Sequence, residues 1–320
     1  MNAGRRVLVA LILVLPWLGG CAMPAGREAP YLMVLGTAQD AGYPQIGCKE
    51  AHCEAARKDP SKRRFAVSLL LADPATGRRF LFDCGPDIRE QVELARGHPS
   101  SRVEEGPRPP LFDGIFLTHA HMGHYSGLIE MGREAYGARD LPVWGSERMR
   151  AFLSREAPWR LLVETGALVL RPISPESAID LGSALRVEAL RVPHRDEFSD
   201  TMAFRIRGPR RSVLYLPDID KWETLSPSIE SLIEGVDLAL LDGTFFGADE
   251  VPGRSMAEIP HPFIEESMRR FAGLSAEQRR KVRFIHLNHG NPAMDPDGSA
   301  AGAVRAAGLG LAEQGELIDL

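Results

Sequence analysis

Three histidines stand within six residues directly after a strand-like run, and this arrangement constrains the chain more than any other feature. Residues 114–118 are followed by His119, His121 and His124. In an extended backbone, side chains two residues apart project to the same side, so His119 and His121 can bind one ion together. A turn at 122–123 lets His124 approach from another direction. Imidazole is a common ligand of zinc and iron, and the chain has only nine histidines, so we expect a metal site here.

The first thirty residues are predicted to be a targeting signal and a tether. Arg5 and Arg6 precede the apolar run 7–15, and small residues then lead to Cys21. This pattern is typical of an export signal, and the run is too short to span a bilayer, which takes about 20 residues. The segment resembles a bacterial lipoprotein signal, with the signal peptide at 1–20, lipid on Cys21 and a tether at 21–30. We therefore expect an exported lipoprotein, anchored to the membrane through Cys21 on the periplasmic or cell-surface side. The alternative is a plain secretory signal with a chance cysteine.

Composition excludes several classes of protein. The chain has 320 residues, a formal charge of −5 and four cysteines. Its negative charge argues against a general nucleic-acid binder, and four cysteines are too few for a disulfide scaffold. From residue 31 onward strands and helices are interspersed, which predicts a layered α/β or α+β domain over 31–320. The expected strands are 31–35, 66–71, 80–82, 114–118, 168–173, 185–192, 202–206, 212–216, 238–241 and 282–287, and the expected helices are 87–96, 126–136, 146–156, 222–234, 264–271 and 299–314.

Four more motifs follow the pattern of one known family. Asp83-Cys84-Gly85 ends a strand, His194 follows Val192-Pro193, Asp218 ends the run 213–217, and His286 and His289 close the run 284–289. Together with the histidine triplet, these motifs resemble the metallo-β-lactamase fold, whose signature is His-x-His-x-Asp-His after a strand. The resemblance covers roughly residues 31–291. It implies an α/β (α+β) chain folded as a four-layer αβ/βα sandwich.

The resemblance also implies two neighbouring metal positions. The first would be bound by His119, His121 and His194, and the second by His124, Asp218 and either His286 or His289. The signature aspartate is replaced by Gly123, which has no ligand atom. Three outcomes follow: one metal, two metals with His289 as a substitute ligand, or a metal other than zinc. We favour one tightly held ion, zinc being expected and iron or manganese the alternatives.

The leading hypothesis for function is metal-dependent hydrolysis. A bound ion lowers the pKa of its water and so supplies hydroxide at neutral pH. Asp218 would bind the metal and relay a proton, and His124 would steady the developing charge. The substrate would be a small molecule or peptide carrying an ester, lactone, amide or phosphodiester bond.

A narrower resemblance suggests two alternatives. The segments 35–45, 85–89, 194–201, 241–246 and 286–292 resemble the branch of pyrroloquinoline quinone biosynthesis protein B, which is associated with oxidative modification of a peptide. One alternative is therefore an iron-dependent oxidative enzyme like that branch. The other is a non-catalytic metal-binding lipoprotein that lost turnover with the aspartate at position 123.

Several residues are expected to support the site or the fold. Asp83 and Asp242 end apolar strands and would accept hydrogen bonds from ligand histidines or loop amides. Cys48, His52 and Cys53 leave three interpretations open: a structural zinc site, a disulfide or free thiols. Cys84 is expected to be a small buried residue. His98 and His261 lie beside prolines and are expected at the surface.

Overall fold

The computed structural model describes residues 29–96, 110–175, 177–248, 250 and 259–320. Cys21, the predicted signal peptide, most of the predicted tether and His98 lie outside these residues. Within them, no helix has both the length and the apolar character that a bilayer-spanning segment needs.

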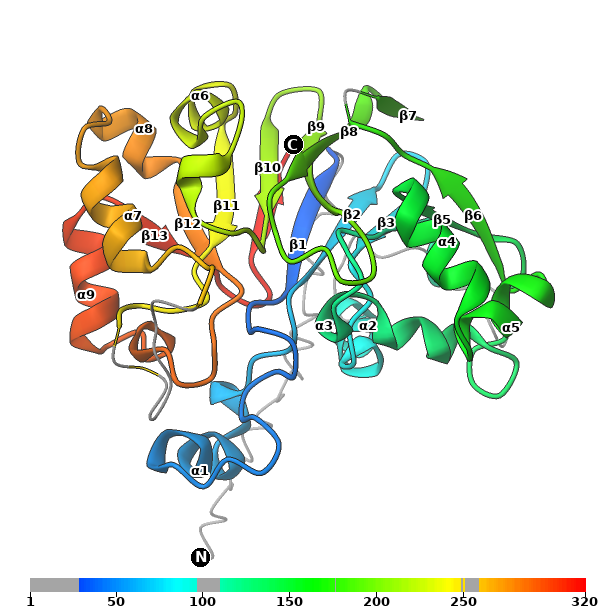
Figure 1. The fold of residues 1–320 in the computed structure, drawn as a ribbon, viewed down its shortest axis with the longest axis horizontal. Coiled ribbons are helices and arrows are strands. Elements are labelled where there is room, and N and C mark those ends of the chain that lie inside the picture. The colour runs from blue at the N-terminus through cyan, green and yellow to red at the C-terminus, as the bar shows by residue number, and fades with distance from the viewer. Residues whose placement is uncertain (1–28, 97–109, 176, 249, 251–258) are drawn as a thin grey trace, which may run out of the picture.

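Two mixed β-sheets stack face to face in the middle of the molecule (Figure 1). Among the described residues, the first sheet has the strand order β14-β1-β2-β3-β4-β5-β6 and the second has the order β13-β12-β11-β10-β9-β8-β7. The strands of the first sheet are β1 (Tyr31–Gly36), β2 (Ser68–Asp73), β3 (Arg78–Phe82), β4 (Gly114–Phe116), β5 (Leu141–Gly145), β6 (Leu168–Pro172) and β14 (Leu317–Asp319). Those of the second are β7 (Ala178–Gly182), β8 (Leu185–Val192), β9 (Thr201–Arg207), β10 (Ser212–Leu216), β11 (Leu238–Asp242), β12 (Val282–Ile285) and β13 (Gly310–Leu311).

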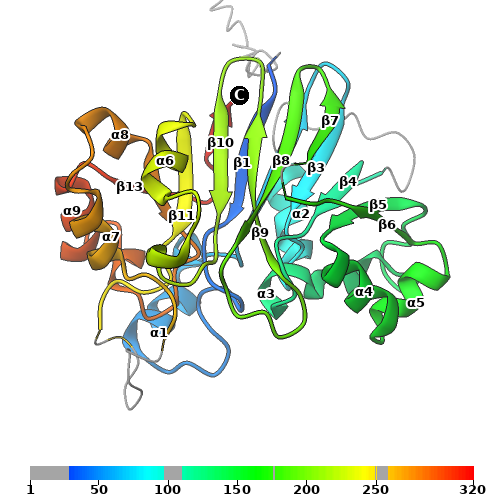
Figure 2. The same ribbon diagram turned by 45° about the horizontal axis from the view of Figure 1, so that its top comes forward.

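Helices cover the outer face of each sheet, as Figures 1 and 2 show from two directions. The helices are α1 (Ala51–Lys58), α2 (Ile88–Arg96), α3 (Met122–Tyr125), α4 (Glu147–Arg155), α5 (Trp159–Glu164), α6 (Ile229–Glu234), α7 (Ile264–Phe271), α8 (Ala276–Arg280) and α9 (Ser299–Ala306). Helices α2 to α5 lie against the first sheet, and α6 to α9 lie against the second. Helix α1 stands apart, below both sheets in Figure 1. The resulting layers are helix, sheet, sheet and helix.

The alternation of side chains along β1 shows why the sequence builds three apolar layers. Leu32 and Val34 point into the core between the two sheets, whereas Tyr31, Met33 and Leu35 point toward α2 and its neighbours. All five side chains are buried, because a strand covered on both faces presents successive residues to opposite layers.

Three predicted helices are shorter than expected. The predicted helix 126–136 is a 3₁₀ segment over Ser126–Met131 only. The predicted helix 222–234 is a 3₁₀ turn at Trp222–Thr224 followed by α6, since Pro227 lies between them and cannot continue a helix. The predicted helix 299–314 ends at Ala306, because Gly308 adopts a left-handed conformation with φ of 77°. The chain then forms β13, which extends the edge of the second sheet.

Candidate metal centre

The loops that follow β1, β4, β8, β10, β11 and β12 meet at one end of the two sheets, and they carry most of the predicted site residues. His119 and His121 come directly after β4. His121 has an extended backbone and precedes the first turn of α3. The two imidazole rings therefore lie on the same side of the chain, with centroids 4.4 Å apart.

Four donor atoms converge here from three separate segments, and we call His119, His121, His194 and Asp218 the first group. His121 Nδ1 lies 2.8 Å from His119 Nε2 and 3.2 Å from His194 Nε2. Asp218 Oδ2 lies 3.3 Å from His119 Nε2, 3.8 Å from His121 Nδ1 and 3.1 Å from His194 Nε2. Ligands of a tetrahedral ion with bonds of 2.0–2.1 Å lie about 3.3 Å from one another. The spacing in the first group fits such an ion.

The outward nitrogen of each ring in the first group is held by a polar neighbour. His119 Nδ1 lies 3.0 Å from Thr118 Oγ1, and His121 Nε2 lies 3.0 Å from Glu197 Oε2. His194 Nδ1 lies 3.0 Å from Asp220 Oδ1. Such partners fix the orientation of a ligand ring and leave the inward nitrogen free to bind a metal.

His124 and His286 form a second group beside the first. His124 Nδ1 donates to Asp83 Oδ2 at 2.9 Å, and His286 Nδ1 lies 2.8 Å from Thr244 Oγ1, which in turn donates to Asp242 Oδ1 at 2.7 Å. The Nε2 atoms of both rings are buried and have no hydrogen-bond partner among the described residues. Asp218 Oδ2 lies 3.9 Å from His124 Nε2, so this carboxylate stands between the two groups.

Asp83 and Asp242 each accept hydrogen bonds from more than one segment around the two groups. Asp83 also accepts hydrogen bonds from the Thr118 amide at 2.8 Å and from the Tyr215 hydroxyl at 3.0 Å. Asp242 Oδ2 accepts the Ile219 amide at 3.1 Å. Each carboxylate thus ties a ligand-bearing loop to a neighbouring strand.

The structure separates the two alternative histidines of the last motif. His286 lies in the second group, but His289 does not: its ring lies 6.0 Å from that of His52, which is in the first turn of α1. The prediction that His289 might substitute in the second position is therefore wrong. The backbone is held at Leu287 by a hydrogen bond from its amide to Thr37 O. The chain then turns at 288–291, and this turn places His289 away from the centre.

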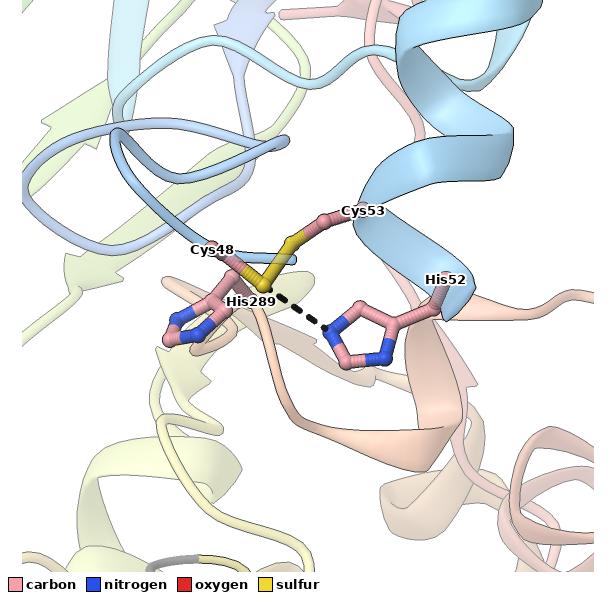
Figure 3. A group of neighbouring side chains, drawn as sticks. All are labelled: Cys48, His52, Cys53 and His289. Atoms are coloured by element: carbon pink, nitrogen blue, oxygen red, sulfur yellow. Dashed lines mark hydrogen bonds between the residues drawn. A yellow bond between two sulfur atoms is a disulfide. The ribbon is translucent and has the colours of Figure 1, made fainter. Parts of the chain in front are cut away.

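Cys48, His52, Cys53 and His289 form a peripheral cluster, shown in Figure 3. Cys48 and Cys53 are joined by a disulfide with Cα atoms 6.1 Å apart. Of the three interpretations of these cysteines, the structure adopts the disulfide rather than the zinc site, because paired sulfurs provide no thiolate ligand. Cys84 is a free, fully buried cysteine, as expected.

The charge states of the buried groups differ from one ligand to the next. Burial holds the pKa of His119 and of His286 well below the usual value, so both rings are neutral and keep a lone pair. Burial also lowers the pKa of His124 and of His194, but the neighbouring carboxylates outweigh it and raise both, to about 8 for His124. Burial alone would raise the pKa of Asp218, but the charges of His194 and His261 hold that pKa well below its usual range. Neutral imidazoles and an ionised carboxylate are the forms that bind metals, so an ion at His124 or His194 would compete with a proton.

His261 was expected at the surface, and this prediction is wrong. The side chain is buried, with Nδ1 at 2.9 Å from Asp242 Oδ2 and 3.2 Å from Asp218 Oδ1. Burial lowers the pKa of His261, but the two carboxylates outweigh it and raise this pKa to about 9. His261, like Asp220, comes from a loop without a local motif, so nothing in the sequence pattern pointed to it.

A cleft of about 1140 Å³ opens between the loop after β1, the peripheral cluster and the segment after β11. Its lining is mixed, including the polar residues Asp40, Lys49 and Asn288 and the apolar residues Phe245 and Ile259. The residues of the first and second groups do not line it, whereas Asp40, which lies beside the second group, does.

The sequence matches the beta-lactamase superfamily domain over residues 78–287, which is more than half of the chain. The chain belongs to this superfamily. The predicted metallo-β-lactamase fold, with its two mixed sheets between helices, is confirmed.

Relatives of similar length match about nine tenths of this chain. Coenzyme PQQ synthesis protein B of Methylococcus capsulatus is 27% identical over 309 residues, which cover 89% of this chain and 98% of that protein. The protein of the same name from Azotobacter vinelandii is 25% identical, with coverage of 91% and 100%. These matches place the chain near the branch that its sequence motifs resemble.

Solved structures show the same fold. The Zn²⁺-bound PqqB from Methylobacterium extorquens has a TM-score of 0.76 at 21% identity and covers 91% of this chain and 100% of its own. A diphosphatase of the PhnP family has a TM-score of 0.64 at 22% identity, with coverage of 91% and 97%. The donor set of this chain supports a metal centre.

Proposed function

We propose that this protein is a metal-dependent hydrolase whose essential ion is bound by the first group. The observation that carries the proposal is the convergence of His119 Nε2, His121 Nδ1, His194 Nε2 and Asp218 Oδ2 at the spacing of a tetrahedral site. Three imidazoles and one carboxylate form a typical zinc donor set. An ion bound there supplies a Lewis acid and an activated water at neutral pH.

The residues around the first group have separate tasks. Asp218 binds the ion through Oδ2, while Oδ1 lies 3.2 Å from His261 Nδ1. With a pKa of about 9, His261 is protonated at neutral pH. Nδ1 of His261 also lies 2.9 Å from Asp242 Oδ2, so this ring joins the ligand carboxylate to a second, supporting carboxylate. In the proposal, His261 is therefore the residue that positions Asp218.

The substrate class remains broad. The cleft has room for a small molecule or a short peptide segment, and its lining offers both apolar and polar contacts. We propose an ester, lactone, amide or phosphodiester substrate, since one fold can host many substrates.

The double variant His119→Ala/His121→Ala tests the proposal. It should lose bound metal and lose turnover of every active substrate in a broad ester and phosphodiester panel. The matched control for metal binding is His52→Ala/His289→Ala, which removes two imidazoles from the peripheral cluster and should retain the bound metal. Turnover that survives in the first double variant refutes the hydrolase proposal.

A second candidate is an oxidative enzyme like its PQQ-synthesis relatives, and the full-length similarity to them favours it. Elemental analysis of protein purified without added metal separates the two candidates. Zinc with hydrolytic turnover supports the hydrolase. Iron, together with oxygen consumption in the presence of a peptide substrate, supports the oxidative enzyme. Metal without turnover in either assay supports a non-catalytic metal-binding protein.

We also propose that the protein is exported and anchored through lipid on Cys21. Besides the signal-like residues 1–20, the Cys48–Cys53 disulfide supports an oxidising compartment, because disulfides are rare in the cytosol. Labelled palmitate should enter the wild-type chain and not Cys21→Ser, and the wild type should fractionate with membranes. A wild type without label, recovered in the soluble fraction, contradicts the anchor.

A further inference from the structure

We propose that Asp40 is the carboxylate ligand of a second metal ion, in place of the aspartate that position 123 lacks. This inference rests on the metal centre of the proposed function. It adds an ion held by Asp40, His124 and His286, with Asp218 shared between the two positions.

The packing around Gly123 shows that Asp40 fills the space of the missing side chain. A Cβ atom at position 123 would lie 2.4 Å from Asp40 Cα and 2.6 Å from Asp40 Oδ1. Both distances are far below a van der Waals contact, so the turn carrying Asp40 and a side chain at 123 exclude each other. The glycine is therefore a requirement of this packing. A carboxylate is still present at this place, but it comes from the loop after β1.

The donor atoms around Asp40 are arranged for a cation. One donor atom on each of Asp40, His124 and His286 lies within 4.8 Å of the others. Because both rings use Nδ1 for supporting hydrogen bonds, their free nitrogens are the Nε2 atoms, which are fully buried and unpartnered among the described residues. A buried polar atom without a partner is costly, and a metal ion would satisfy both nitrogens at once.

The carboxylate of Asp40 is free to serve as a ligand. It forms no hydrogen bond or ion pair with another described residue, and it faces the cleft. Its backbone φ is 32°, in the left-handed region that favours glycine and that aspartate adopts more readily than most residues. An aspartate in this strained backbone conformation is consistent with a functional role of its carboxylate.

Hydrogen bonds tie the turn of Asp40 to the segment that carries His286. The Gln39 amide donates to Leu287 O at 2.9 Å, and Asn288 Nδ2 donates to Gln39 Oε1 at 2.7 Å. The Gly42 amide closes the turn by donating to Gln39 O at 3.0 Å. These hydrogen bonds fix the position of Asp40 relative to His286.

Zinc titration of the metal-free full chain tests the inference. Oxidising conditions keep the Cys48–Cys53 disulfide closed, so the peripheral cluster provides no thiolates. Calorimetry and elemental analysis should give two equivalents for the wild type. Asp40→Asn should keep one and bind the second at least about 100-fold more weakly, since even supporting residues of metal sites cost about 10–100-fold.

The matched control is Asp87→Asn. Asp87 supports the same region, accepting the Ala66 amide at 2.7 Å and lying beside Gly42, but it is not part of the second group. The Asp87→Asn variant should bind two equivalents of zinc, as the wild type does. Circular dichroism and thermal unfolding should show that both variants are folded.

A zinc-loaded crystal of the wild type keeps the inference testable if Asp40→Asn does not fold. Its anomalous map should show one peak within the first group and a second bonded to Asp40. A wild type with one equivalent, an Asp40→Asn variant with two or with none, or a second peak away from Asp40 overturns this inference. A wild type with no zinc in the first group overturns the proposed function as well.

Discussion

The first group and the peripheral cluster contain similar residues, yet they differ in how those residues are held. Each consists of four potential ligands whose donor atoms lie within 4.8 Å of one another. In the first group, Thr118, Glu197 and Asp220 hold the outward nitrogens of the three rings. In the peripheral cluster, the described residues include no carboxylate bonded to either imidazole, His52 is exposed and the sulfurs are joined to each other. Proximity of ligand residues is therefore weaker support for a metal centre than the hydrogen bonds behind them.

The largest effect is expected from removing the carboxylate that supports His124. Asp83→Ala removes the acceptor from three buried donors: the Thr118 amide, the Tyr215 hydroxyl and His124 Nδ1, which keeps only a longer contact with the Thr118 hydroxyl. It should lower the free energy of unfolding by about 3–5 kcal/mol. Urea denaturation measures this change. Asp59→Ala, at an exposed turn, is the control and should have a far smaller effect. If both variants lost the same free energy of unfolding, the hydrogen bonds of Asp83 would stabilise the fold no more than those of an exposed turn.

Asp220 orients the His194 ring but does not belong to the first group, so it can be replaced while all four ligands are kept. Asp220→Ala should weaken zinc binding to the first group by about 10–100-fold, because the ring loses the partner that orients it. Calorimetric titration measures the affinity. The control is Asp196→Ala, which removes a carboxylate paired with Arg148 and Arg191 at the surface. Unchanged affinity in Asp220→Ala would contradict the comparison.

Opening the disulfide should affect stability and leave the central metal in place. Cys48→Ser/Cys53→Ser removes a cross-link over a short loop, which should lower the free energy of unfolding by about 2 kcal/mol or less. Zinc bound to the first group should be unchanged. Loss of that zinc would show that the two clusters are coupled.

The smallest effect concerns the buried thiol of Cys84. Burial, with a smaller contribution from Asp83, raises its pKa well above the usual value, so the reactive thiolate is not formed at neutral pH. Iodoacetamide followed by peptide mass spectrometry should leave Cys84 unlabelled in the folded protein. After mild reduction, Cys48, which is only partly buried, should be labelled. Labelling of Cys84 without unfolding would contradict its burial.

The sequence was most informative where one local pattern determines the structure. The strand predicted at 185–192 and the helix predicted at 264–271 have the bounds of β8 and α7, because both are long apolar-periodic segments. Strand β5, Leu141–Gly145, was not predicted. It contains a proline and a glycine in five residues, and its pairing with β4 and β6 sets its conformation.

The same limit applies to the site. His119, His121, His194, Asp218 and His286 follow strands in recognisable motifs, and the structure brings all five to one end of the sheets. Asp40, Asp220 and His261 come from loops with no such motif, and their positions depend on contacts between distant segments. Gly123 was noted as a missing ligand, but only the packing shows which residue occupies its space.

The position of the centre between the two sheets has a consequence for assembly of the protein. His119, His121 and His124 belong to the half of the chain built on the first sheet, whereas His194, Asp218 and His286 belong to the half built on the second. Neither half alone can form a complete coordination sphere. Ion uptake must therefore follow docking of the two halves, and its free energy stabilises their association rather than either half by itself.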